Sequence, residues 1–216
     1  MKKYLKILFV FICLMLLAIF LASAKVVVPM EFQNMVDASV LISSTSGRGS
    51  GVFIEDNVVL TAAHLLKKGG VYRIELRDGT ILESSNFYID TEEDIGFIFV
   101  RGEELHIATV TSHTMNLGDT VYLVGAPFDG SFKFTLTKGI VSHLSRDFYE
   151  WKWKDLLQVD AEGGPGCSGG PLYDSDGNII GIYVGQVGGG GRGISLCESA
   201  KSILEAYRRC KDAINQ

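Results

Sequence analysis

The sequence has no surplus of basic residues and no basic cluster with interleaved aromatic residues. It holds 20 Lys and Arg against 25 Asp and Glu, which gives a net charge of −5. A nucleic-acid-binding surface needs a basic patch, so the composition excludes nucleic acid as a partner. Histidine, cysteine and carboxylate residues also lack the spacing of a metal site. We therefore expect neither a metal nor another cofactor.

A paired cysteine framework is missing as well. Cys13 lies in an apolar leader, which leaves Cys167, Cys197 and Cys210. An odd number outside the cytoplasm leaves at least one thiol unpaired. Cys197 and Cys210 flank an expected helix that would separate them by about 20 Å. Because a disulfide needs Cα atoms within about 7 Å, we expect no bridge between them.

The long apolar run of the chain lies at its N-terminus. Three lysines precede the 16 apolar residues 7–22, and Ala22-Ser23-Ala24 has the form of a signal-peptidase site. As a helix the run spans about 24 Å, slightly less than the hydrocarbon core of a bilayer. Residues 1–24 are predicted to be a cleaved signal peptide, with an uncleaved membrane anchor as the alternative. Both engage the membrane at least transiently and leave the rest secreted, periplasmic or tethered, outside the cytoplasm. Cleavage would lower the net charge to −8, because residues 1–24 hold three lysines and no acid.

From residue 38 onward, short runs rich in Val, Ile, Phe and Tyr alternate with Gly, Asp, Asn and Ser. This pattern is typical of an all-β protein. The expected strands form two sets, which are 40–43, 51–54, 58–61, 71–76, 81–89 and 95–100, then 108–110, 120–124, 132–143, 156–160, 171–173, 179–186 and 192–196. Two such sets predict two six-stranded antiparallel β-barrels, which close their own edges.

Two short polar segments are predicted to be hairpin turns. Residues 77–80 contain Asp78-Gly79, which accepts positive φ at low cost. Residues 174–178 resemble the start of a calcium loop, but they lie between strands and lack the glutamate that such a loop needs at its twelfth position.

In the last segment, the spacing of the apolar residues changes from that of strands to that of a helix. Ala200, Ile203, Leu204 and Tyr207 follow helical spacing with charged residues between them, which predicts an amphipathic helix packed on the second barrel. The resulting division is a connector at 25–37, a first barrel at 38–105, a second barrel at 106–197 and a C-terminal helix at 198–216.

Three separated motifs carry the chemistry. Ser168 lies in Gly-Cys-Ser-Gly-Gly, His64 follows Thr-Ala-Ala, and Asp94 precedes an apolar run. A serine hydroxyl is a poor nucleophile unless a base accepts its proton and a third group orients that base. These residues are the predicted catalytic triad. Gly166 permits a turn that would direct its N–H and that of Ser168 at one oxyanion.

Other residues compete for two of these roles. His106, His113 and His143 are the other histidines, and only His64 follows a strand and a small-residue turn. Asp90, Glu92 and Glu93 lie close to Asp94, which alone directly precedes the strand. We assign the neighbouring acids to a solvated loop.

These motifs resemble the trypsin-like serine peptidases, and most closely the HtrA/Deg branch. The resemblance spans residues 38–204, and the segments that carry it are 49–54, 59–64, 94–98, 118–128, 139–142, 160–166 and 166–171. It implies a protease domain that acts on polypeptides. Many HtrA relatives also carry a PDZ domain, but because the sequence stops at Gln216 we expect the protease domain only. Because HtrA relatives are often trimers, it also admits a homo-oligomer. Animal trypsins have a cysteine after the histidine, where this chain has Leu65.

Cys167 departs from the family, which has aspartate or asparagine at this position. Cysteine cannot form the activating salt bridge of trypsins. We interpret it as a small buried residue, with a redox-sensitive thiol as the alternative.

The resemblance also suggests how substrate is held. Tyr183, Val184 and Gly185 resemble a strand that pairs with an extended peptide. Glu162 falls by count at the selector position of trypsins, although a carboxylate at the pocket rim is the preferred interpretation. Tyr149, Trp151 and Trp153 alternate with polar residues, and we expect them to pack on the barrel, with a substrate or membrane contact as the alternative.

The sequence therefore predicts a serine endopeptidase that cleaves exposed or unfolded proteins outside the cytoplasm through an acyl-enzyme. One alternative is an inactive peptide-binding module on a protease fold, which a deformed turn at Cys167 would produce. An esterase is a third interpretation.

Overall fold

The computed structural model describes residues 30–102, 105–128, 131–148, 153–187 and 193–215, together with Tyr4 and Met15. Nearly all of the leader, residues 149–152 with Tyr149 and Trp151, and the side chain of Trp153 lie outside this description. Among the described residues, no helix is both long and apolar enough to cross a bilayer.

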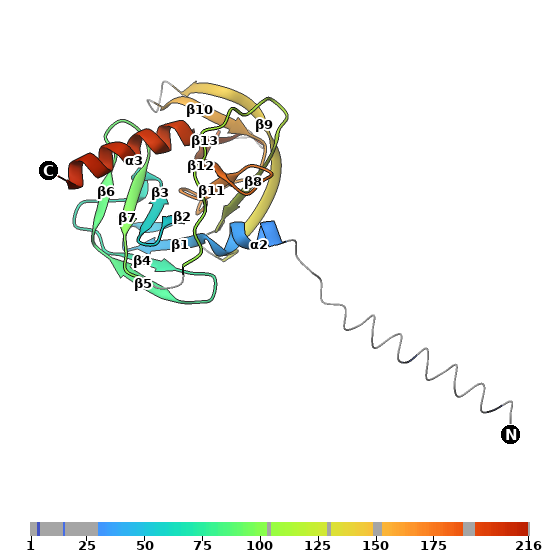
Figure 1. Ribbon diagram of the computed structural model, residues 1–216, viewed down its shortest axis with the longest axis horizontal. Helices are drawn as coiled ribbons and strands as arrows, with labels where there is room; N and C mark the ends of the chain where they lie inside the picture. Colours follow the sequence, from blue (N-terminus) through green and yellow to red (C-terminus); the bar gives the residue numbers. More distant parts are fainter. Residues whose placement is uncertain are drawn as a thin grey trace.

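The N-terminal half of the chain forms one antiparallel sheet of seven strands (Figure 1). Its core strand, β3, follows the buried pattern of Val58–Thr61, in which every residue is buried. The hydrogen-bonded order is β5-β4-β1-β2-β3-β7-β6. The strands are β1 (Ser39–Ser44), β2 (Gly47–Glu55), β3 (Val58–Thr61), β4 (Tyr72–Glu75), β5 (Ile81–Ser84), β6 (Phe87–Ile89) and β7 (Gly96–Phe99).

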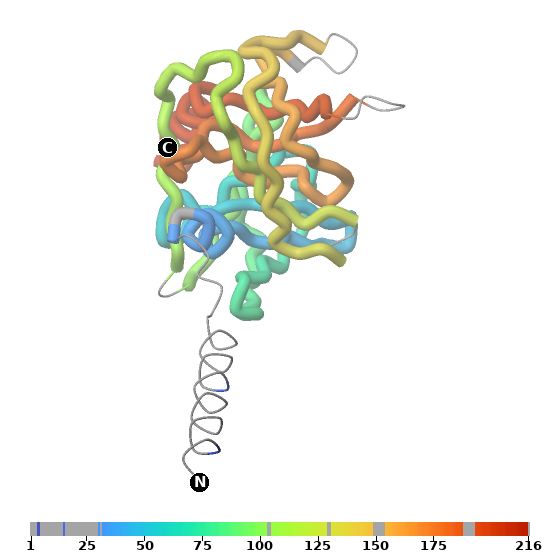
Figure 2. The backbone as a smooth tube through the Cα atoms, turned by 90° about the vertical axis from the view of Figure 1, so that its right-hand side faces the viewer, coloured from blue at the N-terminus to red at the C-terminus, as the bar shows by residue number. Residues whose placement is uncertain are grey.

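The C-terminal half forms a closed barrel of six strands in the order β10-β13-β12-β11-β8-β9. Each strand therefore has a hydrogen-bonded neighbour on both sides for at least part of its length, which is the closure that the sequence pattern predicts. The strands are β8 (Thr120–Gly125), β9 (Thr135–Phe148), β10 (Trp153–Val159), β11 (Pro171–Tyr173), β12 (Ile179–Gln186) and β13 (Ser195–Ser199). Figures 1 and 2 show the two halves stacked against each other.

The predicted trypsin-like architecture is confirmed, and several details differ. The first half has seven strands and not six, because the expected strand 81–89 divides into β5 and β6. The hydroxyl of Ser84 accepts the N–H of Asn86 at 3.0 Å and turns the chain there. The strand order of this half is also open, whereas we expected a closed barrel. Val110 contributes only an isolated bridge to Ile179 in place of a strand. Residues 30–37 of the expected connector form helix α2 (Met30–Asp37).

Helix α2 joins the two halves. The Met35 carbonyl accepts hydrogen bonds from the hydroxyls of Ser39 in β1 (2.8 Å) and Tyr173 in β11 (3.0 Å). Phe32 packs its ring against Tyr122 of β8, with centroids 5.0 Å apart. These contacts bury Met35 and fix the entry of the chain into the first sheet.

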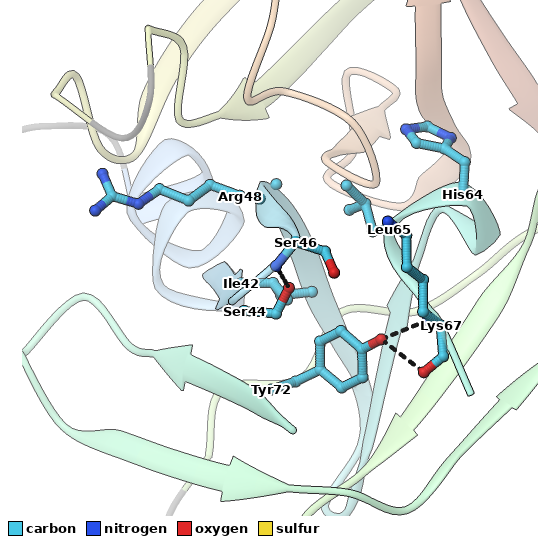
Figure 3. A pocket seen from close by; sticks show the side chains of 10 residues that line it. Ile42, Ser44, Ser46, Arg48, His64, Leu65, Lys67 and Tyr72 are labelled. Atoms are coloured by element: carbon cyan, nitrogen blue, oxygen red, sulfur yellow. Dashed lines mark hydrogen bonds between the residues drawn. The ribbon is translucent and has the colours of Figure 1, made fainter. Parts of the chain in front are cut away.

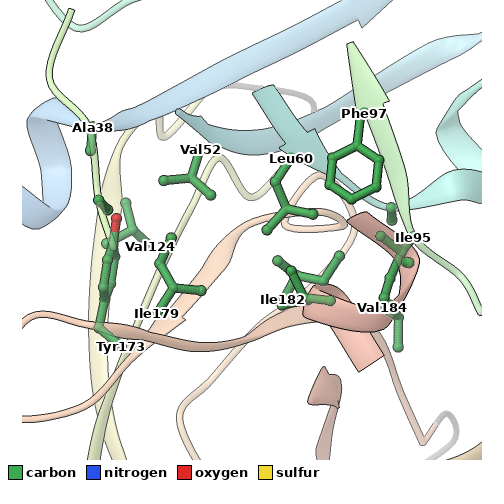
Figure 4. Close-up of a cluster of buried hydrophobic side chains, with 14 of the residues drawn as sticks. Ala38, Val52, Leu60, Ile95, Phe97, Val124, Tyr173, Ile179, Ile182 and Val184 are labelled. Carbon is green, nitrogen blue, oxygen red and sulfur yellow. The ribbon is translucent and has the colours of Figure 1, made fainter. Parts of the chain in front are cut away.

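One apolar core extends across the interface between the halves (Figure 4). Leu60 and Phe97 of the first sheet belong to the same cluster as Ile182 and Val184 of β12, and all four are buried. Helix α3 (Ala200–Ile214) covers one side of this interface. Its N-cap, Ser199, accepts the N–H of Ser202 at 3.2 Å, as helix starts require.

Helix α3 packs on the second barrel as predicted, and it also reaches the first sheet. The Tyr207 ring lies 5.1 Å from that of Phe97 in β7. The relative placement of the two halves therefore depends on the shared core and on both helices.

Candidate active site

Strand pairing brings His64 and Asp94 together. Thr61 at the end of β3 is paired with Gly96 at the start of β7, and the two side chains project from the chain just beyond this pair. His64 lies on a short 3-10 turn, η1 (Ala63–Leu65). Its Nδ1 lies 2.6 Å from Asp94 Oδ2, and its backbone N–H donates to Asp94 Oδ1 at 2.8 Å. The carboxylate thus fixes both the ring and the backbone of His64.

Asp94 is much more buried than His64, as expected for a carboxylate that orients a histidine base. The Asp94 side chain is 9% exposed, whereas that of His64 is 42% exposed. The carboxylate is therefore shielded, while much of the His64 ring is open to solvent, as a histidine that transfers protons requires.

The competing histidines lie in other environments. His113 Nδ1 lies 3.6 Å from Oδ2 of Asp174, a residue in the turn between β11 and β12. His143 accepts the N–H of Ser145 at 3.2 Å within β9. Neither has a contact with Asp94, so the geometry favours His64 over both.

Asp90 is the main alternative to Asp94 as the carboxylate of the triad. Its hydrogen bonds instead stabilise the acidic loop. Its buried carboxylate receives the Arg209 guanidinium of α3 at 2.8 and 2.9 Å. It also accepts the backbone N–H groups of Glu92 and Glu93. Burial alone would raise the pKa of Asp90, but the hydrogen bonds from Arg209 and from these two N–H groups outweigh it and hold the pKa below its ordinary value.

We expect Arg209→Ala to lower the free energy of unfolding by about 2–3 kcal/mol, because it leaves Asp90 buried without its counter-ion. A carboxyl whose pKa is depressed by folding stabilises the protein above its unfolded pKa and loses this effect as the pH falls. The difference between wild type and variant in urea unfolding should therefore be full at pH 7 and should shrink below about pH 4.

The matched control is Arg208→Ala, since Arg208 is the exposed neighbour of Arg209 on the same helix. It should change stability by less than about 0.5 kcal/mol. Equal losses for both variants would contradict the role assigned to the Arg209–Asp90 pair.

Ser168 lies where the second barrel touches the first sheet. Its carbonyl accepts the N–H of Ser50 in β2 at 2.7 Å. Gly169 has φ +81°, and a Cβ there would lie 2.2 Å from Thr61 Oγ1, three residues before His64. A Cβ at Gly49 would meet both Leu65 and the Ser168 carbonyl. Small residues thus let the Ser168 segment approach the His64 turn closely.

The Ser168 hydroxyl makes no hydrogen bond with any part of the chain that the structure describes. Without substrate, such contacts are commonly long and tighten on binding.

The turn before Ser168 leaves two backbone N–H groups without an acceptor among the described residues. Pro165 and Gly166 are the central residues of a β-turn closed by the Cys167 N–H and the Gly164 carbonyl at 2.9 Å. Gly166 has φ +97°, which this turn type requires at its third position. The Pro165 carbonyl accepts the Phe128 N–H at 3.0 Å. Because a trans peptide places its N–H opposite its carbonyl, the Gly166 N–H points away from Phe128.

Ser168 shows the same arrangement. The Cys167 carbonyl accepts the Gly170 N–H at 2.8 Å, so the Ser168 N–H is directed to the other side. Neither this N–H nor that of Gly166 has an acceptor among the described residues. Ser50 stabilises the turn, since its hydroxyl donates to the Gly166 carbonyl (2.8 Å) and accepts the Ala126 N–H (3.0 Å).

The side chain of Cys167 faces the interior. It is 3% exposed and lies so close to Gly125 of β8 that a Cβ there would be 2.8 Å from its sulfur. Burial raises the pKa of the Cys167 thiol, which disfavours the reactive thiolate. These features fit the interpretation of a small buried residue. In the described part of the chain, Cys167, Cys197 and Cys210 are free thiols, and no bridge joins Cys197 to Cys210.

The four residues expected to bind substrate lie in three different environments. The N–H and C=O of Tyr183 are bonded to Gly170 and Gly169, and its buried ring packs on Gly163. Pairing between β12 and β11 ends at Ile182, so Val184 and Gly185 face an unpaired edge near Ser168. Glu162 is exposed, and its carbonyl accepts the Thr137 hydroxyl at 3.0 Å.

A cavity of about 210 Å³ lies on the first-sheet side of His64 (Figure 3). His64 and Lys67 lie at one end and Arg48 at the other. Lys67 is fixed through its backbone N–H, which donates to the Tyr72 hydroxyl at 2.6 Å. No acidic side chain belongs to the described lining, which consists of Ile42, Ser44, Ser46, Gly47, Arg48, Gly49, His64, Leu65, Lys67 and Tyr72.

Residues 49–182 match the family model described as the trypsin-like peptidase domain. The chain belongs to this family. The chain is 32% identical over 167 residues to a probable periplasmic serine endoprotease, DegP-like, of Brucella suis, covering 73% of the chain and 32% of the relative. It is 34% identical over 142 residues to a putative serine protease, HhoB, of Synechocystis, covering 63% of the chain and 34% of the relative. The chain thus spans about one third of the length of these relatives.

Among solved structures, the chain is similar to an HtrA-type protease, AlgW, bound to a tripeptide. The TM-score is 0.73 at 29% identity, and the match covers 81% of this chain and 61% of the other. The resemblance to the HtrA/Deg branch is confirmed by these relatives.

Sequence reasoning missed three residues that position the site. Ser50 and Arg209 act on segments more than one hundred residues away, and no local pattern indicates such contacts. Glu198 could have been noticed in the sequence, because it is the one charged residue of the strand Ser195–Ser199.

Proposed function

We propose that this chain is a serine endopeptidase that cleaves peptide bonds through an acyl-enzyme. Ser168 attacks the carbonyl, His64 accepts its proton and returns it to the leaving amine, and Asp94 stabilises the protonated ring. The observation that supports the proposal is that the N–H groups of Gly166 and Ser168 have no acceptor among the described residues, because an oxyanion hole needs two such free donors.

The turn geometry also bears on the alternative of an inactive binding module. Such a module needs a deformed oxyanion turn, with the carbonyl of Pro165 directed into the site. That carbonyl is instead held by the Phe128 N–H, and Cys167 packs inward without distorting the turn. Both features favour the enzyme.

Substrate binds as an extended segment along the free edge of β12 at Val184 and Gly185. Folded proteins rarely present such segments, so exposed or unfolded polypeptides are the substrate class. The leaving-group side lies over His64, and the cationic cavity with Lys67 favours acidic side chains there. The chain acts outside the cytoplasm, a placement supported by the leader composition and by relatives named as periplasmic.

Digestion of a denatured protein, with mapped cut sites and fluorophosphonate labelling, tests this function. Gly166→Ala should lower kcat/KM by about 10²–10³-fold, the loss typical of one oxyanion donor. Its Cβ would lie 2.3 Å from the Ala126 carbonyl, and φ +97° disfavours alanine, so the turn must change.

Gly164→Ala is the matched control in the same turn. A Cβ at Gly164 has no atom within 4 Å, and its φ is ordinary, so activity should be retained. Equal activity of both variants would contradict the oxyanion assignment. Wild-type protein that neither labels nor digests would overturn the function itself, and labelling with cleavage of esters alone would identify an esterase.

A further inference from the structure

A buried carboxyl group lies directly behind the proposed catalytic aspartate. Glu198 is paired with Ile182 in the ladder between β13 and β12, and it is only 1% exposed. One side-chain oxygen, Oε1, accepts the backbone N–H of Asp94 at 3.3 Å. The other, Oε2, is buried and has no hydrogen-bond partner among the described residues. Buried carboxyl groups are usually paired, so this one requires an explanation.

The charges that face Glu198 are of its own sign. Glu93 and Asp94 face it from the loop between β6 and β7, and Asp155 acts on it from β10. Cys197, its neighbour in β13, is a buried thiol. Arg209 of α3 binds Asp90, and His64 of η1 binds Asp94, so both of these groups are engaged with other carboxylates.

These surroundings favour the neutral acid. Burial chiefly, with the negative charge of Glu93 second, raises the pKa of Glu198 to about 8. A neutral carboxyl still accepts the Asp94 N–H through its carbonyl oxygen, so the contact with Asp94 persists in this form.

We propose that Glu198 is a positioning residue of the active site, which supports Asp94 while it is protonated and withdraws that support when it ionises. The proposal rests on the proposed function. An ionised Glu198 has no cation within the described site and only one N–H donor, so it is driven toward water and repelled by the Asp94 carboxylate. The Asp94 N–H then loses its hydrogen bond to Glu198, and the hydrogen bond between the Asp94 carboxylate and His64 Nδ1 weakens. The active site thus switches off on the alkaline side.

Glu198→Gln separates the charge from the contact. Glutamine stays neutral at every pH and keeps an oxygen for the Asp94 N–H. We expect the rate of fluorophosphonate labelling of the wild type to fall about tenfold through an alkaline limb near pH 8. The Gln variant should match the wild type at pH 7 and lack this limb. Glu205→Gln, an exposed residue on α3, should keep the wild-type profile.

Thermal unfolding provides a readout that does not depend on catalysis. Because folding raises the Glu198 pKa from an ordinary value of 4.5, the folded state binds more protons than the unfolded state between about pH 4.5 and 8. The Tm of the wild type should therefore fall relative to Glu198→Gln as pH rises through this window, and the difference should become constant above it.

The outcomes are distinct. If the wild type is labelled and the Glu198→Gln variant shows the same alkaline limb in its labelling rate, the role proposed for Glu198 is overturned and the proposed function is not. A wild type that is not labelled at any pH would overturn the proposed function and this role with it. If the Gln variant does not fold, Glu198→Leu replaces it. Leucine suits the burial and cannot ionise, so it should also abolish the alkaline limb, while loss of the oxygen lowers kcat with little change in KM.

Discussion

Replacing Ser168 by alanine is expected to lower kcat about 10⁶-fold on a peptide substrate and to abolish fluorophosphonate labelling. The alanine removes the proposed nucleophile, so the proposed acyl-enzyme could not form and the paired His64 and Asp94 would have no hydroxyl to activate. Ser168 is partly exposed and its hydroxyl makes no hydrogen bond with the described residues, so folding should be unaffected. Active-site labelling followed by intact-mass measurement detects the loss directly.

Ser175→Ala is the control, because Ser175 is an exposed serine of the same barrel in the turn between β11 and β12. It should keep full activity and labelling. Labelling that survives in Ser168→Ala would show that another side chain is the nucleophile, with adjacent Cys167 the first to test by Cys167→Ala.

The second large effect is expected for Asp94→Asn, which should lower kcat about 10⁴-fold. Asp94 Oδ2 lies 2.6 Å from His64 Nδ1 and requires a proton on that nitrogen, which leaves Nε2 free to accept the proton of Ser168. The amide nitrogen of asparagine donates instead of accepting. It therefore favours the opposite tautomer of His64, whose Nε2 cannot act as a base. Steady-state kinetics at saturating peptide measure the loss.

Asp56→Asn is the matched control, since Asp56 is an exposed carboxylate in the turn between β2 and β3. Its kcat should equal that of the wild type. Circular dichroism should show both variants folded, because the asparagine that replaces Asp94 can still accept the His64 backbone N–H through its side-chain oxygen. A kcat for Asp94→Asn within tenfold of the wild type would remove Asp94 from the triad.

Much of the fold follows from local pattern. The strand 58–61 and the strands 171–173 and 179–186 have the predicted bounds, because their apolar runs end at turn residues. The turns at Gly79 and Gly177 have φ +90° and +83°, the values for which glycine is suited. The division into β5 and β6 was missed, since the Ser84 hydroxyl competes with the ladder in a run that otherwise reads as one strand.

The candidate triad could also be predicted from the sequence, because each member stands next to a strand in a distinctive short motif. Choosing Asp94 over Asp90 was harder, since both lie in one acidic loop. The structure separates them by their partners, His64 for Asp94 and Arg209 for Asp90.

Most of the strands, the turns and the identity of the chemical groups could be predicted from local sequence, because they depend on the properties of neighbouring residues. Only the tertiary structure decided how the groups are supported. Ser50 lies 116 positions from Gly166, and Glu198 lies 104 positions from Asp94. Such contacts form where β2 meets the nucleophile loop and where β13 meets the acidic loop, so they depend on how the two halves pack. Packing of that kind is set by a core shared between distant segments, which no local pattern encodes.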